Sequence, residues 1–113
     1  MSRQPAPIEI DPSEYHDWRQ APEAYPHFLL DIREPWEHRM AHLPGDQLIP
    51  IDEVPARIGE IPRDADLVIY CHHGVRSFQV AYYLRQHGYD RARSLRGGIA
   101  RWSAEFDSSI PQY

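Results

Sequence analysis

The stretch Tyr70-Cys71-His72-His73-Gly74-Val75-Arg76-Ser77 holds the chain's only cysteine and lies between two segments of different pattern. The run that ends in it, Leu67-Val68-Ile69-Tyr70, is short, apolar and rich in β-forming residues, which predicts a buried strand. After it, the apolar residues between Ser77 and His87 recur with helical spacing, which predicts a helix. Open α/β sheets bind ligands at the carboxyl ends of their strands, and the pattern places Cys71 at such an end.

Composition restricts the class of protein. A chain of 113 residues is most simply one domain, residues 1–113, with a real core. Its net charge of −5 argues against nucleic acid as a partner. No segment approaches the ~18 consecutive apolar residues of a membrane span, and the first ten residues lack a signal-peptide core, so we expect no membrane partner and a cytoplasmic location. A lone cysteine also fits a reducing compartment.

The remainder of the chain alternates between strand-like and helix-like segments. The expected strands are residues 8–10, 28–32, 47–49, 67–70 and 93–95. The expected helices are residues 13–19, 35–41, 52–61, 77–87 and 99–106. Asp11, Pro12 and Glu14 carry the pattern of a capped helix start. Since strand and helix alternate about five times with short connections, we expect an α/β fold, a five-stranded mostly parallel sheet with helices on both faces.

Cys71 is the candidate catalytic residue. A thiol attacks as the thiolate, so its loop must stabilise negative charge. The positive end of the following helix and the Arg76 guanidinium would both do so. Gly74 can adopt a positive φ, which turns successive backbone N–H groups toward the sulfur. The alternative is an inert buried thiol, which is the commoner fate of a lone cysteine.

Two further pairs of residues could belong to a site. Asp31 and Arg33 follow a strand and fall near Cys71 if the strands are parallel, where a structural ion pair is the simpler interpretation. His38 and His42 have the four-residue spacing of a metal pair, but the sequence places no third ligand beside them. We therefore expect no metal.

The segment 71–77 resembles the active-site loop of single-domain rhodaneses, the thiosulfate sulfurtransferase family. The match extends to both sides of this loop, in the family's order. Before it, Leu29-Leu30-Asp31-Ile32-Arg33-Glu34-Pro35-Trp36-Glu37 is similar to the family's first signature, which His42-Leu43-Pro44-Gly45 with Ile49-Pro50 continues. After it, Leu95-Arg96-Gly97-Gly98-Ile99 with Trp102 resembles the C-terminal signature. The resemblance runs from about Ile8 to the end of the chain. Ala41 stands where the family usually has glycine, and Asp46 where it usually has a small apolar residue.

The resemblance implies a rhodanese-like fold and sulfur transfer in two steps, without a metal or organic cofactor. Cys71 takes the outer sulfur of a donor such as thiosulfate, which releases sulfite and leaves a Cys71 persulfide. An external acceptor, either cyanide or a thiol, then removes that sulfur, and the acceptor thiol could belong to a protein. The implied substrate-binding residues are His72, His73, Gly74, Val75, Arg76 and Ser77, with Asp31 and Arg33 as supports. Because the chain has no second cysteine, no internal thiol can resolve the persulfide.

Two other functions stay open from the sequence. One is a non-catalytic module that carries sulfur or binds a regulatory partner, since a fold does not guarantee activity. The other is a cysteine-dependent phosphatase, because phosphatases share this fold. Their loop is one residue longer, since a tetrahedral phosphate needs a wider cradle than one sulfur atom. Here four residues separate Cys71 from Arg76, which favours sulfur. His72 and His73 could line an entrance or simply lie on a surface loop.

Overall fold

The five predicted strands form one parallel sheet in the computed structural model, which describes residues 6–113. The strands are β1 (Glu9–Ile10), β2 (Phe28–Asp31), β3 (Gln47–Leu48), β4 (Leu67–Tyr70) and β5 (Ala92–Leu95). Their order across the sheet is β1-β5-β4-β2-β3, and every neighbouring pair is parallel. The α/β fold with a parallel sheet that the sequence predicts is therefore confirmed, and β4 lies at the sheet's centre.

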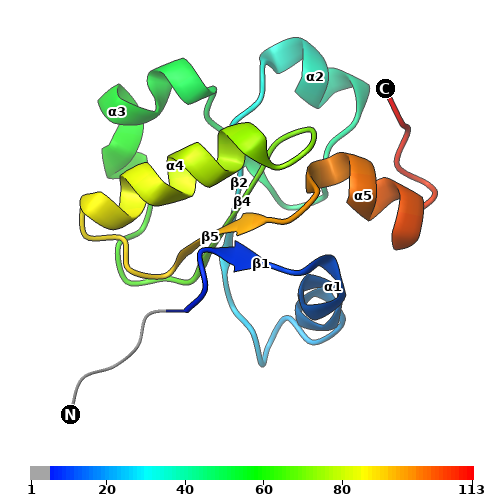
Figure 1. Cartoon of the computed structure of the whole chain (residues 1–113), viewed down its shortest axis with the longest axis horizontal. Helices are drawn as coiled ribbons and strands as arrows, with labels where there is room; N and C mark the ends of the chain where they lie inside the picture. Colours follow the sequence, from blue (N-terminus) through cyan, green and yellow to red (C-terminus); the bar gives the residue numbers. More distant parts are fainter. Residues whose placement is uncertain (1–5) are drawn as a thin grey trace.

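Helices cover both faces of the sheet (Figure 1). They are α1 (Pro12–Gln20), α2 (Pro35–Met40), α3 (Val54–Arg57), α4 (Val75–Gln86) and α5 (Gly98–Glu105). Residues of α3 and α4 pack in one apolar cluster, and residues of α1 and α5 pack in the other. Along β4, Leu67 and Ile69 belong to the first cluster, as does Cys71 immediately after the strand, whereas Val68 and Tyr70 belong to the second. This alternation is that of a strand buried on both faces.

Two local predictions were wrong. The expected helix over residues 52–61 is divided into a 3₁₀ turn (Ile51–Glu53), the one-turn helix α3 and a second 3₁₀ turn (Ile58–Glu60). Pro55 lies in the first turn of α3, where it fixes the backbone and supplies no N–H for a longer helix through this point. The Asp11 side chain makes no capping hydrogen bond to α1.

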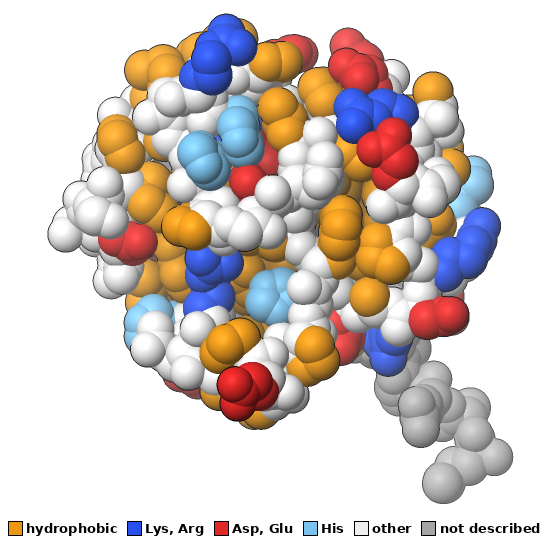
Figure 2. All heavy atoms as spheres, turned by 180° about the vertical axis from the view of Figure 1, so that it is seen from behind, with side chains coloured by type: hydrophobic (Ala, Val, Ile, Leu, Met, Phe, Trp, Pro, Cys, Tyr) orange, Lys and Arg blue, Asp and Glu red, His pale blue; other side chains and the backbone are white. Residues whose placement is uncertain are grey.

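The surface is mixed in charge. On the face opposite to that of Figure 1, acidic and basic side chains are interspersed among hydrophobic ones (Figure 2). In the described part of the chain, the helices are too short and too polar to cross a membrane.

The start of α5 fixes the base of the loop that contains Cys71. The N–H of Ile99 donates to the Cys71 carbonyl at 2.9 Å, and the N–H of Ala100 donates to the His72 carbonyl at 3.0 Å. This close approach requires glycine at Gly98, where φ is +63° and a Cβ would lie 2.4 Å from the His72 carbonyl oxygen. The Gly97-Gly98 pair therefore joins the last helix to the loop through backbone contacts.

We expect Gly98→Ala to lower the free energy of unfolding by about 2–4 kcal/mol, because the added Cβ meets backbone atoms at a positive φ. Urea unfolding measures this change. Gly59→Ala is the matched control, since a Cβ there meets nothing within 4 Å, and it should change stability by no more than about 1 kcal/mol. Equal stability of the two variants would contradict the packing described for α5.

Candidate active site

Cys71 is buried, with 1% of its surface exposed, in a loop that leads into the amino-terminal end of α4. Its Sγ accepts the N–H groups of Gly74 at 3.1 Å and Ser77 at 3.3 Å, and the thiol also contacts Ser77 Oγ at 3.3 Å. Ser77 Oγ is held in turn by Ser94 Oγ at 2.7 Å. The sulfur thus occupies the place where a helix presents free N–H groups and positive potential.

Gly74 gives the loop its shape. It has φ +100°, as the sequence predicts, and it is the residue that precedes the first turn of α4. The helix therefore begins at Val75, two residues earlier than expected. That earlier start places Ser77 within the first turn, which is why its N–H is free to point at the sulfur.

Arg76 is held by a partner that the sequence analysis did not identify. Its two terminal nitrogens donate to the two carboxylate oxygens of Glu37, at 2.8 and 3.0 Å. Glu37 lies on α2 and also accepts the Glu34 N–H at 3.1 Å, within a capping box at the helix start. The bond from Arg76 is the main reason that the pKa of Glu37 falls to about 2. Arg76 remains one third exposed, and its contact with a donor stays a prediction.

Asp31 and Arg33 form the ion pair that the sequence predicts. Arg33 Nε and one terminal nitrogen donate to the two oxygens of Asp31, each at 2.9 Å, and both side chains have 0% exposure. The parallel register pairs Asp31 with Tyr70, which places the ion pair beside the strand that delivers Cys71. The pair is anchored in the sheet, and its role as a support of the loop stays a prediction.

Tyr113 connects this ion pair to Glu37, the partner of Arg76, and no local pattern in the sequence predicts this role. Its hydroxyl accepts from Arg33 at 2.6 Å and donates to Glu37 Oε2 at 2.8 Å. Burial raises the pKa of the Tyr113 hydroxyl to about 12, so it stays protonated and able to donate. Its ring stacks on His72, with centroids 4.0 Å apart and planes at 11°.

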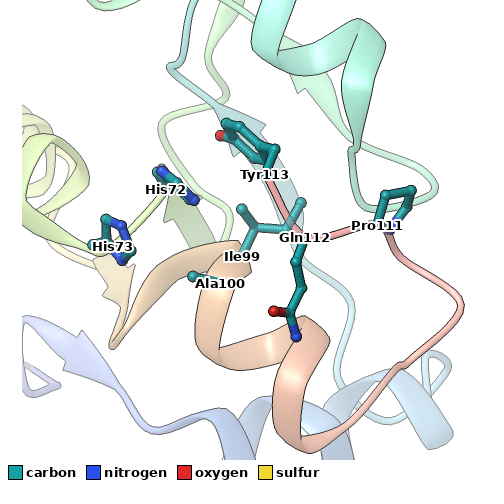
Figure 3. Close-up of a pocket in the computed structure, with 7 residues that line it drawn as sticks. All are labelled: His72, His73, Ile99, Ala100, Pro111, Gln112 and Tyr113. Atoms are coloured by element: carbon teal, nitrogen blue, oxygen red, sulfur yellow. The ribbon is translucent and has the colours of Figure 1, made fainter.

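His72 and His73 line a hollow of about 160 Å³ beside the loop (Figure 3). The other lining residues are Ile99, Ala100, Pro111, Gln112 and Tyr113. Burial and the neighbouring His73 lower the pKa of His72, which favours its neutral form. Of the remaining candidate residues, Val75 is 67% exposed at the helix start. The structure thus brings together all the residues from 71 to 77, whereas their roles toward a substrate stay predictions.

The expectation that His38 and His42 lack a third ligand nearby was wrong. Asp46 approaches them from the following turn, and one potential ligand atom of each residue lies within 4.8 Å of the others. However, the two imidazole rings are stacked, 4.1 Å apart with planes at 14°, and His42 Nδ1 contacts the His38 carbonyl at 3.0 Å. His38 Nδ1 instead contacts Asp31 Oδ2 at 3.0 Å, and the Tyr70 hydroxyl donates to Asp46. This arrangement is a hydrogen-bond network against the sheet.

A parallel α/β sheet with a buried cysteine at the start of a central helix defines the class of protein. The chain belongs to the rhodanese-like domain family, whose model matches residues 11–105. A sulfurtransferase of Allochromatium vinosum is 47% identical over 75 residues, which are 66% of this chain and 70% of that protein. The probable adenylyltransferase/sulfurtransferase MoeZ of Mycobacterium tuberculosis is 32% identical over 106 residues.

The match to the mycobacterial protein covers 92% of this chain but 26% of that protein, so the chain spans about a quarter of its length. Among solved structures, a rhodanese-related protein of Thermoplasma volcanium superposes with a TM-score of 0.78 at 27% identity. That superposition covers 88% of this chain and 94% of the other. The family model that matches the sequence and the solved structure that matches the fold thus point to the same rhodanese-like family.

The Glu37–Arg76 ion pair should make stability depend on pH. Because the pKa of Glu37 falls from 4.5 to about 2 on folding, its stabilisation is present above pH 4.5 and is lost as the pH falls toward 2. We therefore expect Glu37→Gln to destabilise the protein at neutral pH, and this difference from wild type should shrink by about 1–2 kcal/mol between about pH 6 and pH 3.

Urea unfolding at the two pH values measures this difference. Glu53→Gln is the control, because Glu53 pairs with Arg57 in an exposed ion pair and should show no comparable dependence on pH. A Glu37→Gln destabilisation that is the same at both pH values would contradict the assignment of the ion pair.

Proposed function

We propose that this protein is a sulfurtransferase that carries a sulfur atom as a persulfide on Cys71. The observation that carries the proposal is the pair of N–H groups, from Gly74 and Ser77, that point at Cys71 Sγ at the positive end of α4. Such a site stabilises the thiolate, which is the reactive form of cysteine. Membership of the rhodanese-like family and relatives named as sulfurtransferases support the same chemistry.

In the first step, the Cys71 thiolate attacks the outer sulfur of a donor such as thiosulfate. A new S–S bond forms to Cys71, while the S–S bond of the donor breaks and its electron pair leaves with sulfite. In the second step, a nucleophilic acceptor attacks the outer sulfur of the persulfide, and the Cys71 thiolate is the leaving group. The cycle needs no external oxidant or reductant, since sulfur moves between nucleophiles.

The loop residues have distinct parts in this proposal. The N–H groups of Gly74 and Ser77 hold the negative sulfur in both states. Arg76, one third exposed, provides positive charge for an anionic donor. His72 and His73 form a wall of the neighbouring hollow and would border the path of the donor or acceptor. Val75 is exposed at the loop's outer edge, where an acceptor could contact it.

The acceptor comes from outside the chain. Cys71 is the only cysteine among the 113 residues, so no second thiol of this segment can take the sulfur. Cyanide serves as a small test acceptor, and a thiol is the natural class of acceptor, whether it belongs to a small molecule or a protein. The low exposure of Cys71 means that the acceptor must present a narrow nucleophilic group to the loop.

We expect thiosulfate to add the mass of one sulfur atom to the protein and to release sulfite, because the loop stabilises the attacking thiolate. Intact-protein mass spectrometry and peptide mapping would find the sulfur on Cys71, and cyanide would remove it as thiocyanate. Cys71→Ser should lose both reactions and is the control for sulfur bound elsewhere.

Absence of the adduct together with absence of sulfite release would contradict the enzyme proposal. A persulfide that forms but is not removed by cyanide or a thiol would favour a sulfur carrier over an enzyme. Hydrolysis of an aryl phosphate that is lost in Cys71→Ser would favour a phosphatase.

A further inference from the structure

The segment that follows α5 contributes to the site, although the family match ends at residue 105. This segment is anchored: the Ser103 hydroxyl donates to the Ile110 carbonyl at 2.5 Å, and Ile110 is 6% exposed in the apolar cluster with Trp102. From that anchor the chain returns through Pro111 and Gln112 toward the loop, and the Tyr113 ring stacks on His72 (Figure 3). Tyr113 is therefore held against the site by its stack on His72 and by an edge contact with Trp36 at 6.1 Å.

The Tyr113 hydroxyl completes the hydrogen bonding of Glu37. Glu37 Oε1 accepts from the Glu34 N–H and from Arg76, while Oε2 accepts from Arg76 and from Tyr113. These four bonds fill about four acceptor positions, which is the full capacity of a carboxylate. Because Glu37 is only 4% exposed, water cannot readily replace a donor that is removed.

The same hydroxyl also fixes where Glu37 lies. It accepts from Arg33, and Arg33 is locked to Asp31 with both side chains fully buried. The hydrogen bonds thus run from the sheet through Tyr113 to Glu37, and from Glu37 to Arg76. Phenylalanine cannot replace tyrosine in this role, because the hydroxyl both accepts from Arg33 and donates to Glu37.

We propose that Tyr113 is a positioning residue of the active site, which holds the guanidinium of Arg76, a residue of the Cys71 loop, by fixing its partner Glu37. Its ring also closes one side of the hollow lined by His72. Arg33 also donates to the Glu37 backbone carbonyl at 3.4 Å, but Tyr113 links Arg33 to the Glu37 carboxylate itself. Without the hydroxyl that carboxylate loses this link, and Arg76 is held less firmly. This inference rests on the proposed function, in which Arg76 presents positive charge to an anionic donor.

Alkylation of Cys71 tests the inference without any sulfur transfer. Iodoacetate is an anion and iodoacetamide is neutral, so the ratio of their rate constants reports the positive potential at the sulfur, to which Arg76 and the start of α4 both contribute. Tyr113→Phe should lower this ratio about threefold, the size of a modest coupling between contacting residues. Partial unfolding would also lower the ratio, but it would raise both rate constants because it exposes the buried thiol. Loss of the positioning contact alone should lower the iodoacetate rate constant and leave the iodoacetamide rate constant near its wild-type value.

Two further variants make the result specific. Tyr82→Phe removes the same hydroxyl from an exposed position on α4 and should leave the ratio unchanged. Glu37→Gln combined with Arg76→Gln removes the ion pair without leaving a buried charge alone, and adding Tyr113→Phe to that protein should have no further effect.

A Tyr113→Phe ratio equal to that of wild type would overturn the inference. So would the same threefold fall in the protein that lacks Arg76, because the hydroxyl would then act by another route. If wild type fails to form a persulfide but the alkylation ratios behave as expected, the proposed function fails and the positioning role stands.

Discussion

The two hydrogen bonds that Gly74 and Ser77 donate to Cys71 Sγ are the interaction on which the rest of the site depends. They require three conditions at once: a strand that ends at Cys71, a positive φ at Gly74, and a helix that begins immediately afterwards. The central strand β4 supplies the first, and its burial on both faces makes the position rigid. The close contact of Gly98 with the loop carbonyls then prevents the loop from relaxing away.

Around this loop the structure buries an unusual amount of charge for a small domain. Asp31, Arg33 and Glu37 are all less than 5% exposed, and a buried charge without partners is costly. Every buried side-chain nitrogen or oxygen in the described residues has a hydrogen-bond partner, so that cost is offset. The consequence for function is geometric: a saturated network has few alternative arrangements, and it holds α2, the loop and the segment after α5 in fixed relation.

The local pattern of the sequence predicts the fold well, because the spacing of apolar residues within each short segment indicates whether that segment is a strand or a helix. The apolar run before Cys71 and the glycine after it were sufficient to place the sulfur and the turn. The missed features are those that join distant segments. Glu37 and Arg76 are 39 positions apart, and Glu37 and Tyr113 are 76 apart, so no spacing rule connects them. The interrupted helix at Pro55 was missed for a different reason, since proline is compatible with a first turn.

A crystal structure of the protein after reaction with thiosulfate would test the central claim most directly. The account predicts a second sulfur atom bonded to Cys71 Sγ, enclosed by the loop and within hydrogen-bond distance of its N–H groups. An unmodified Cys71, or a second sulfur turned away from those N–H groups, would contradict the claim that this loop is built to hold a persulfide.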